Sequence, residues 1–262
     1  MLKMLKRSLL IAFLILIASG IVKDQIFDTP QKSKERVAAS LEKLAQKDLR
    51  VNIFDTDKIL VYKMYFWSLI PMGELRFKMQ VDELGNIFSF EATTKNSFAE
   101  KFIAAKASAE SYFSKNIHLP YKYEEMTDVK GKIKTKEIIF DQANLITTRG
   151  DRKFKIPMNT YDPVSAFVYL LSLPLTQRHE IRFVSGEDVF ILRSSPKETQ
   201  DGICKILIEM ARENKTSSHG AKFYVWVSAD NARVPFVFKC WSPAGYVSVV
   251  LKGIEMTNAK GK

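Results

Sequence analysis

Polar and apolar residues alternate along much of the chain after residue 50. The clearest stretch is residues 74–81, where glutamate, arginine, lysine and glutamine alternate with leucine, phenylalanine, methionine and valine. Successive side chains of a β-strand point to opposite faces of a sheet, so this order predicts a strand with one buried face and one face in water. The alternation favours a mainly antiparallel β fold.

Further strands follow at short intervals, separated by turn residues. Leu84-Gly85-Asn86 joins two of them as a hairpin, and Pro71-Met72-Gly73 predicts a turn or kink. The 18 phenylalanines and 9 tyrosines suit half-buried strands. The predicted strands cover residues 59–66, 74–81, 87–94, 107–115, 118–127, 133–141, 144–149, 180–184, 187–193, 203–210, 222–229, 234–241 and 245–252. We therefore expect one β-rich domain over residues 50–255, with a strongly curved antiparallel sheet or open barrel and a few short helices.

A nearly all-apolar segment at residues 162–172 predicts a buried helix. Asp162 can cap its first turn and Pro163 suits the first helical position. A helix that is apolar on every side must be buried, so we expect it against or inside the curve of the sheet. Its side chains Phe167, Leu170 and Leu171 are the candidate lining of an apolar cavity.

The N-terminus has the pattern of an export signal. Three basic residues precede residues 8–22, an uncharged run of 15. This run is shorter than the roughly 18–20 residues of a spanning helix. Residues 1–22 are therefore predicted to be a signal peptide, cleaved after Gly20, or an uncleaved membrane anchor. In both cases the domain is exported, to the periplasm or to the outer side of the inner membrane.

Residues 30–48 predict an amphipathic helix, because Val37, Leu41 and Leu44 recur at helical spacing among charged residues. This helix would pack on the domain or act as a spacer from the membrane. The chain also has two cysteines, Cys204 and Cys240. If 203–210, 222–229 and 234–241 form a meander, the cysteines lie two strands apart, beyond the roughly 7 Å reach of a disulfide. We expect two free, mostly buried thiols.

The formal net charge is +11, and the densest basic feature is the run Lys130, Lys132, Lys134 and Lys136. In a strand these alternate lysines share one face. They are candidate contacts for an anionic ligand or lipid headgroup. The other interpretation is an edge strand on which lysines prevent aggregation.

The segment from Trp226 to Pro235 contains Ser228, Asp230 and Arg233, residue types that also occur in active sites. Their spacing instead favours a structural hairpin with an Asx turn, formed by Trp226, Asp230, Arg233 and Pro235. The three histidines have no metal-ligand spacing, and no nucleophile elbow or phosphate-binding loop is present in the sequence. The sequence therefore predicts no catalytic residue, no metal and no cofactor, and whether the protein is an enzyme stays open, with the balance against it.

Several segments in a fixed order resemble the bacterial domain-of-unknown-function 3108 family over about residues 57–252. The segments that carry the resemblance are Gly73-Glu74-Leu75, Glu110-Ser111-Tyr112-Phe113, Leu119-Pro120, Tyr121-Lys122-Tyr123-Glu124-Glu125, Phe140-Asp141, Asp162-Pro163-Val164-Ser165-Ala166, Trp226 to Pro235 and Gly245-Tyr246-Val247. The resemblance implies an envelope location and a curved β fold. It implies no established activity and no catalytic residues.

Two functions remain in view. The first is a binding module in the cell envelope for a lipid or another amphipathic ligand. The second is a structural or interaction protein that docks on another envelope component and has no ligand of its own. Partners would be a lipid or an envelope protein, with membrane contact through residues 8–22 if they are not cleaved, and nucleic acid is not expected because an exported protein rarely meets it.

Overall fold

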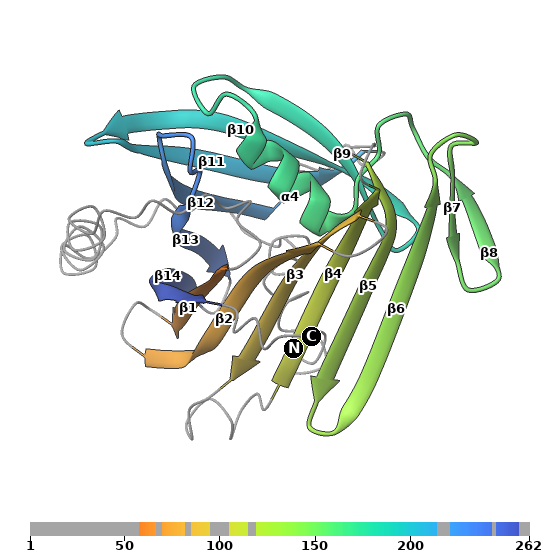
Figure 1. Ribbon diagram of the computed structural model, residues 1–262, viewed down its shortest axis with the longest axis horizontal. Coiled ribbons are helices and arrows are strands. Elements are labelled where there is room, and N and C mark those ends of the chain that lie inside the picture. The colour runs from red at the N-terminus through yellow and green to blue at the C-terminus, as the bar shows by residue number, and fades with distance from the viewer. Residues whose placement is uncertain are drawn as a thin grey trace.

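The computed structural model describes residues 58–66, 70–81, 85–94, 105–114, 119–213, 221–242 and 245–256. Over these residues the chain forms one antiparallel sheet of 14 strands (Figure 1). The strands are β1 Lys58–Phe66, β2 Ile70–Val81, β3 Gly85–Thr94, β4 Ala105–Ser114, β5 Pro120–Val129, β6 Lys132–Asp141, β7 Ile146–Arg149, β8 Arg152–Lys155, β9 His179–Ser185, β10 Asp188–Gln200, β11 Ile203–Arg212, β12 Ala221–Ser228, β13 Pro235–Ser242 and β14 Gly245–Met256. The expected mainly β fold is confirmed.

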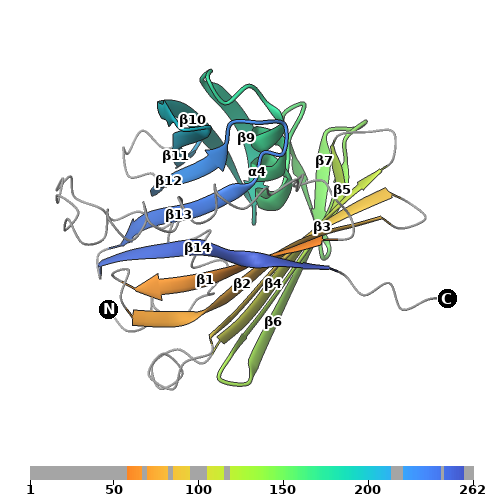
Figure 2. The same ribbon diagram turned by 60° about the vertical axis from the view of Figure 1, so that its left-hand side comes forward.

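The strand order leaves the sheet open at one seam. Consecutive strands pair with one another except β8 and β9, and β1 also pairs with β14. The two ends of the order are therefore β8 and β9, which follow one another in the chain. A single parallel bridge between Tyr161 and Phe183 covers part of the β9 edge. The result is an open barrel with two arms, β2–β6 and β9–β13 (Figure 2).

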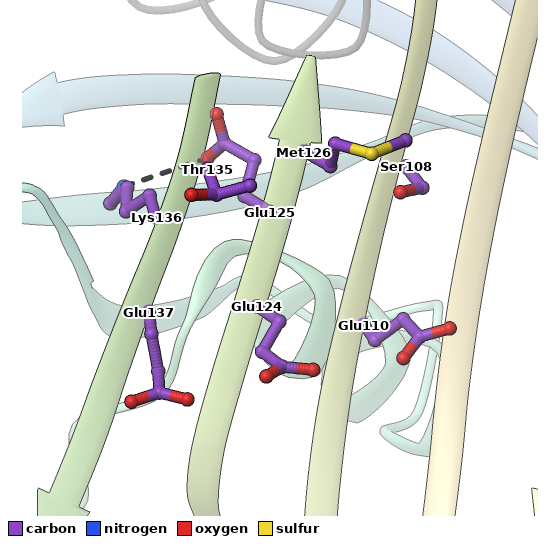
Figure 3. A pocket seen from close by; sticks show the side chains of 8 residues that line it. All are labelled: Ser108, Glu110, Glu124, Glu125, Met126, Thr135, Lys136 and Glu137. Atoms are coloured by element: carbon purple, nitrogen blue, oxygen red, sulfur yellow. Dashed lines mark ion pairs between the residues drawn. The ribbon is translucent and has the colours of Figure 1, made fainter. Parts of the chain in front are cut away.

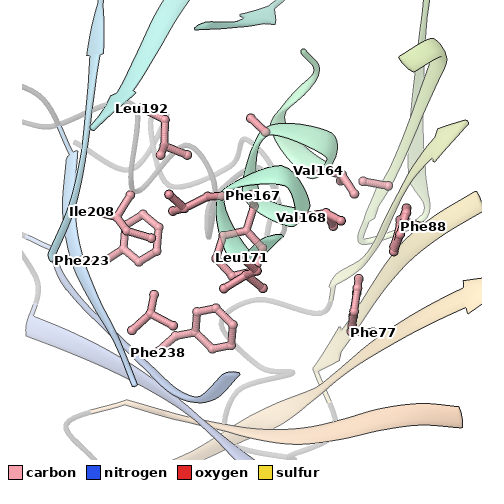
Figure 4. Packing of buried hydrophobic residues seen from close by; sticks show 14 of the residues in the cluster. Phe77, Phe88, Val164, Phe167, Val168, Leu171, Leu192, Ile208, Phe223 and Phe238 are labelled. Carbon is pink, nitrogen blue, oxygen red and sulfur yellow. The ribbon is translucent and has the colours of Figure 1, made fainter. Parts of the chain in front are cut away.

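Helix α4 (Pro163–Ser172) lies between the arms, on the concave face of the sheet (Figures 1 and 2). It begins where the sequence predicts: Asp162 is the N-cap, Pro163 is the first helical residue, and the helix ends before Leu173. It packs on β9, β3 and β4. Side chains from both arms surround it, with Phe77 and Phe88 on one side and Leu192, Ile208, Phe223 and Phe238 on the other (Figure 4).

Two local predictions differ from the structure. The expected kink at Pro71-Met72-Gly73 is a β-bulge inside the continuous strand β2. Gly73 is required there, because a Cβ at this position would lie 2.0 Å from the carbonyl oxygen of Thr93. Strand β8 was not expected, since its four residues include three basic ones and are too few to show a period.

The N-terminal predictions for residues 1–22 and 30–48 lie outside the described residues. Within the described part of the chain, no helix has both the length and the apolar character needed to cross a membrane.

The predicted free thiols agree with the structure. Strands β11, β12 and β13 form the expected meander, and Cys204 and Cys240 are free and buried. Burial also raises the pKa of the Cys240 thiol to about 12. Because the thiolate is the reactive form, a buried thiol with a raised pKa reacts slowly.

We therefore expect neither cysteine of the folded protein to be alkylated by iodoacetamide at neutral pH, and both to be alkylated in denaturant. Mass spectrometry of the alkylated protein measures this. Fast modification of Cys240 before unfolding would contradict the burial of β13.

Candidate functional site

Strands β4 and β5 carry polar side chains on both of their faces. Ser111, Tyr123 and Glu125 point to the concave face, toward α4, and are 6% exposed or less. The residues between them, Glu110, Tyr112, Lys122 and Glu124, point to the convex face. These residues belong to the segments that carry the family resemblance, and they form one polar network on each side of the sheet.

The concave network begins at the cap of α4. Asp162 is fully buried, and its Oδ1 accepts hydrogen bonds from the backbone amides of Val164 and Ser165 at 2.8 and 3.0 Å. Its Oδ2 accepts from the hydroxyls of Ser111 and Ser165 at 2.5 and 2.8 Å. Burial raises the pKa of Asp162 to about 6, although these hydrogen bonds oppose the rise. The cap thus ties the start of the helix to β4.

The network continues through Tyr123 to a buried ion pair. Tyr123 lies directly across from Ser111, and its hydroxyl donates to Glu125 Oε2 at 3.1 Å. Lys136 Nζ lies 3.6 Å from the same oxygen and 5.5 Å from the centre of the Tyr123 ring. The side chains of Glu125 and Lys136 are only 5% and 14% exposed. Two oppositely charged side chains therefore meet inside the core, at the end of a buried polar network.

Burial shifts both partners of this pair toward their neutral forms. It raises the pKa of Glu125 and lowers the pKa of Lys136, and in each case it outweighs the attraction between the two charges. The nearby guanidinium of Arg149 opposes the rise in the pKa of Glu125 and adds to the fall in the pKa of Lys136. Arg149 shares the concave face, because it follows the buried, inward-facing Thr147 by two positions on β7.

The predicted lysine run is divided by the structure. Lys132, Lys134 and Lys136 share the concave face of β6, whereas Lys130 lies in the β5–β6 turn with φ of 53°. Only Lys136 reaches the interior. Lys130, Lys132 and Lys134 are exposed, and none of the three makes an ion pair with another described residue.

The convex network centres on Tyr112. Its hydroxyl contacts Glu110 Oε2 at 2.6 Å and Glu124 Oε2 at 2.8 Å. Lys122 Nζ lies 2.8 Å from Glu124 and 3.5 Å from Glu137. Burial and the two carboxylates raise the pKa of Tyr112 well above its usual range, and the hydrogen bond from Lys122 lowers the pKa of Glu124. The tyrosine has one proton, so it donates to one carboxylate at a time.

A hollow of about 530 Å³ lies at β4–β6 and is lined by Ser108, Glu110, Glu124, Glu125, Met126, Thr135, Lys136 and Glu137 (Figure 3). Three of these carboxylates lie in register across neighbouring strands. Within the described residues, no group of His, Cys, Asp and Glu has an arrangement that could hold a metal ion.

The three helix side chains predicted to line an apolar cavity are packed in the core. Phe167, Leu170 and Leu171 are 7%, 1% and 0% exposed. The ring of Phe167 lies 6.4 Å from that of Phe90 on β3 and 5.6 Å from that of Phe238 on β13. Phe167 therefore bridges the two arms of the sheet.

The segment from Trp226 to Pro235 lies at the turn between β12 and β13. Asp230 Oδ1 accepts a hydrogen bond from the amide of Ala232, and Arg233 donates to the carbonyl of Ala229. Pro235 begins β13, and its carbonyl accepts a hydrogen bond from the buried hydroxyl of Tyr62 on β1. Trp226 pairs with Val237 across the hairpin. These contacts hold strands together and bring no reactive groups into proximity.

Sequence reasoning missed the contacts of Ser111 with Asp162 and of Glu125 with Lys136, and it missed Arg149. The alternation on β5 does separate Glu124 from Glu125 onto opposite faces, but no sequence signal indicates which strand supplies the partner of either carboxylate. The spacing of Ser111 and Asp162, 51 residues apart, is equally uninformative.

Comparisons with known proteins agree with this architecture. A family model described as "Protein of unknown function (DUF3108)" matches residues 61–252. The crystal structure of a β-barrel-like protein of domain of unknown function DUF1849 from Brucella abortus is similar, with a TM-score of 0.57 at 7% identity, over 79% of this chain and 100% of that chain. A protein of the DUF1089 family from Pseudomonas aeruginosa has a TM-score of 0.35 at 9% identity, over 62% of this chain and 87% of that chain. No curated protein matches the sequence. At such identities the Brucella structure shows a shared fold alone.

Proposed function

The chain belongs to the DUF3108 family, and we propose that its domain is an exported envelope protein that binds an amphipathic, anionic ligand such as a lipid on the concave face of the sheet. The export signal predicted at residues 1–22 supports the location. The observation that carries the binding proposal is the buried pair of Glu125 and Lys136 on the concave face, beside the apolar side chains of the core.

A buried ion pair of this kind is poor support for stability. Removing two charges from water costs several kcal/mol per ion, and apolar residues of similar size often stabilise a protein as well or better. Perturbed ionisable groups in such surroundings are typical of functional sites. The concave cluster therefore has the properties expected of a binding site.

The surroundings of the pair suit an amphipathic ligand. Ala109 lies directly across from Glu125 on β4, and Ala107 follows on the same face, so small apolar side chains adjoin the charges. The ammonium of Lys136, with the guanidinium of Arg149 nearby, would contact an anionic headgroup. The alkyl part would lie along the apolar concave surface. Among the four lysines of the run, Lys136 is the headgroup contact that we propose.

The test is native mass spectrometry of the full chain purified from its own envelope, with extraction of any lipid that accompanies it. We expect a stoichiometric adduct of lipid mass that is lost on denaturation. A bare protein mass would rule out tight binding and redirect the search to crosslinked partner proteins.

A double variant separates binding from folding. Glu125→Gln with Lys136→Met removes both charges and keeps similar side-chain volumes, so we expect the free energy of unfolding to stay within about 1 kcal/mol of the wild type or to rise. The lipid adduct should be lost. The matched control is Glu180→Gln with Arg193→Met, which removes an exposed ion pair between β9 and β10 and should keep the adduct. An adduct that survives in the first variant would contradict the role of the concave pair.

A further inference from the structure

The tip of the β5–β6 hairpin, residues 130–134, combines three lysines with an exposed isoleucine. Ile133 is 64% exposed on the convex side of β6, Lys132 and Lys134 flank it in sequence and point to the concave side, and Lys130 lies in the turn. Among the residues that the structure describes, the one acid beside the tip is Asp128, whose Oδ1 accepts a hydrogen bond from the amide of Gly131. Lys136 and its partner Glu125 belong to the interior site and take no part in this surface.

The tip projects from the fold. Strands β4, β5 and β6 extend beyond the region covered by α4, and the β5–β6 turn lies at their far end (Figure 1). The opposite end of the same arm carries Val81 at the end of β2, also exposed at 56%. Both ends thus expose an aliphatic side chain.

Protection of a strand edge explains part of this pattern. The ladder between β6 and β7 covers only Ile139, Phe140 and Asp141, so residues 132–138 of β6 have a partner strand on one side alone. Lysines on such an edge prevent pairing with another chain. Edge protection does not explain Ile133, however, because a large exposed aliphatic side chain favours association.

The conformation of the turn also does not explain why a lysine occupies position 130. Its φ of 53° lies in the left-handed region, where asparagine and glycine are less strained than lysine. The turn geometry alone would therefore be more stable with asparagine. The lysine adds positive charge at the outermost point of the hairpin at the expense of local stability.

We propose that this hairpin tip docks end-on on an anionic lipid bilayer. The end of the hairpin enters the headgroup layer, so that Ile133 on one face inserts among the headgroups while Lys130 in the turn and Lys132 and Lys134 on the other face contact their charges. Peripheral membrane contacts combine a small apolar insertion with basic residues in this way. Charge complementarity and the isoleucine together identify the partner. The docking is separate from ligand binding at Lys136.

The test places a probe at the tip of the full chain. Ile133→Cys carries an apolar fluorophore, and Val81→Cys is the matched control at the other end of the arm. Labelling is selective because Cys204 and Cys240 are buried. The vesicles contain phosphatidylglycerol or phosphatidylcholine alone, with a spin-labelled lipid as quencher, so the readout is local and does not depend on residues 1–22.

We expect quenching at position 133 in phosphatidylglycerol vesicles, little quenching at 133 in phosphatidylcholine, and little at 81 in either. Replacing Lys130, Lys132 and Lys134 by glutamine should weaken the docking equilibrium about 100-fold. Lys130→Asn should weaken it roughly fivefold while leaving thermal stability unchanged or higher.

Equal quenching at 133 and 81, or quenching at 133 that survives the triple glutamine substitution, would overturn the proposal. These tip variants should retain the lipid adduct of the concave site. An intact adduct without docking would therefore count against this inference alone. Docking without an adduct would count against the proposed binding function alone.

Discussion

Replacing Asp162 with alanine should lower the free energy of unfolding by about 2–5 kcal/mol. The N-cap contribution alone is about 1–2 kcal/mol. The substitution also leaves the buried hydroxyl of Ser111 without its carboxylate acceptor, which costs about 1–3 kcal/mol. The hydroxyl of Ser165 keeps the backbone carbonyl of residue 162 as an acceptor. Because Asp162 joins α4 to β4, the loss affects the attachment of the helix as well as its first turn.

Urea unfolding measures this loss, and Asp230→Ala is the matched control. Asp230 makes one bond of the same kind, to the amide of Ala232, but in an exposed turn. Its removal should cost no more than about 1 kcal/mol. Similar losses for the two variants would mean that the buried network around Asp162 contributes nothing beyond a local turn.

The same residue predicts a pH dependence. Burial raises the pKa of Asp162 in the folded protein to about 6, from an ordinary value of 3.8. Between these values the folded state binds more protons than the unfolded state, so this group makes the free energy of unfolding fall as the pH rises from about 4 to about 6. Glu125 acts in the same direction, because burial raises its pKa as well.

The contribution of Asp162 is isolated by comparison with Asp162→Asn, which cannot titrate. Between about pH 4 and pH 6, the unfolding free energy of the wild type should fall by about 2–3 kcal/mol relative to that of the variant. Above about pH 7 the difference between the two proteins should stay constant. A difference that does not depend on pH would show that the carboxylate is ionised throughout.

Replacing Phe167 with alanine should lower the free energy of unfolding by about 3–5 kcal/mol, the usual cost for a buried phenylalanine. Phe167 contacts Phe90 on one arm and Phe238 on the other, so the resulting cavity lies between the two halves of the open sheet. Thermal or urea unfolding measures the loss.

Two controls distinguish packing from a ligand cavity at this position. Phe167→Leu should cost only about 1–2 kcal/mol, since it refills most of the volume. Met158→Ala, at a residue that is 69% exposed, should change stability by less than about 0.5 kcal/mol. If Phe167→Ala instead kept its stability and lost the lipid adduct, Phe167 would line a bound ligand and not the packed core.

The strands and the helix start were predictable because their signals are local. Alternation over residues 74–81 marks a strand and its two faces, and Asp162 with Pro163 marks the first turn of a helix. The same local rule separated Glu124 from Glu125 and placed Lys132, Lys134 and Lys136 together. Strand β8 escaped this reasoning, because four mostly basic residues are too few to establish a period.

By itself, then, the sequence determined the β class and the position of a buried helix, whereas the meander of β11, β12 and β13 that keeps Cys204 and Cys240 apart was only a condition until the structure showed it. Only the tertiary structure decided that β1 pairs with β14, that the seam lies between β8 and β9, and that Lys136 meets Glu125 in the interior. The physical reason is that alternation defines the two faces of a strand but not its neighbours. A shift of one residue in register would exchange every inward and outward side chain, and the register is set by packing of the whole sheet around α4.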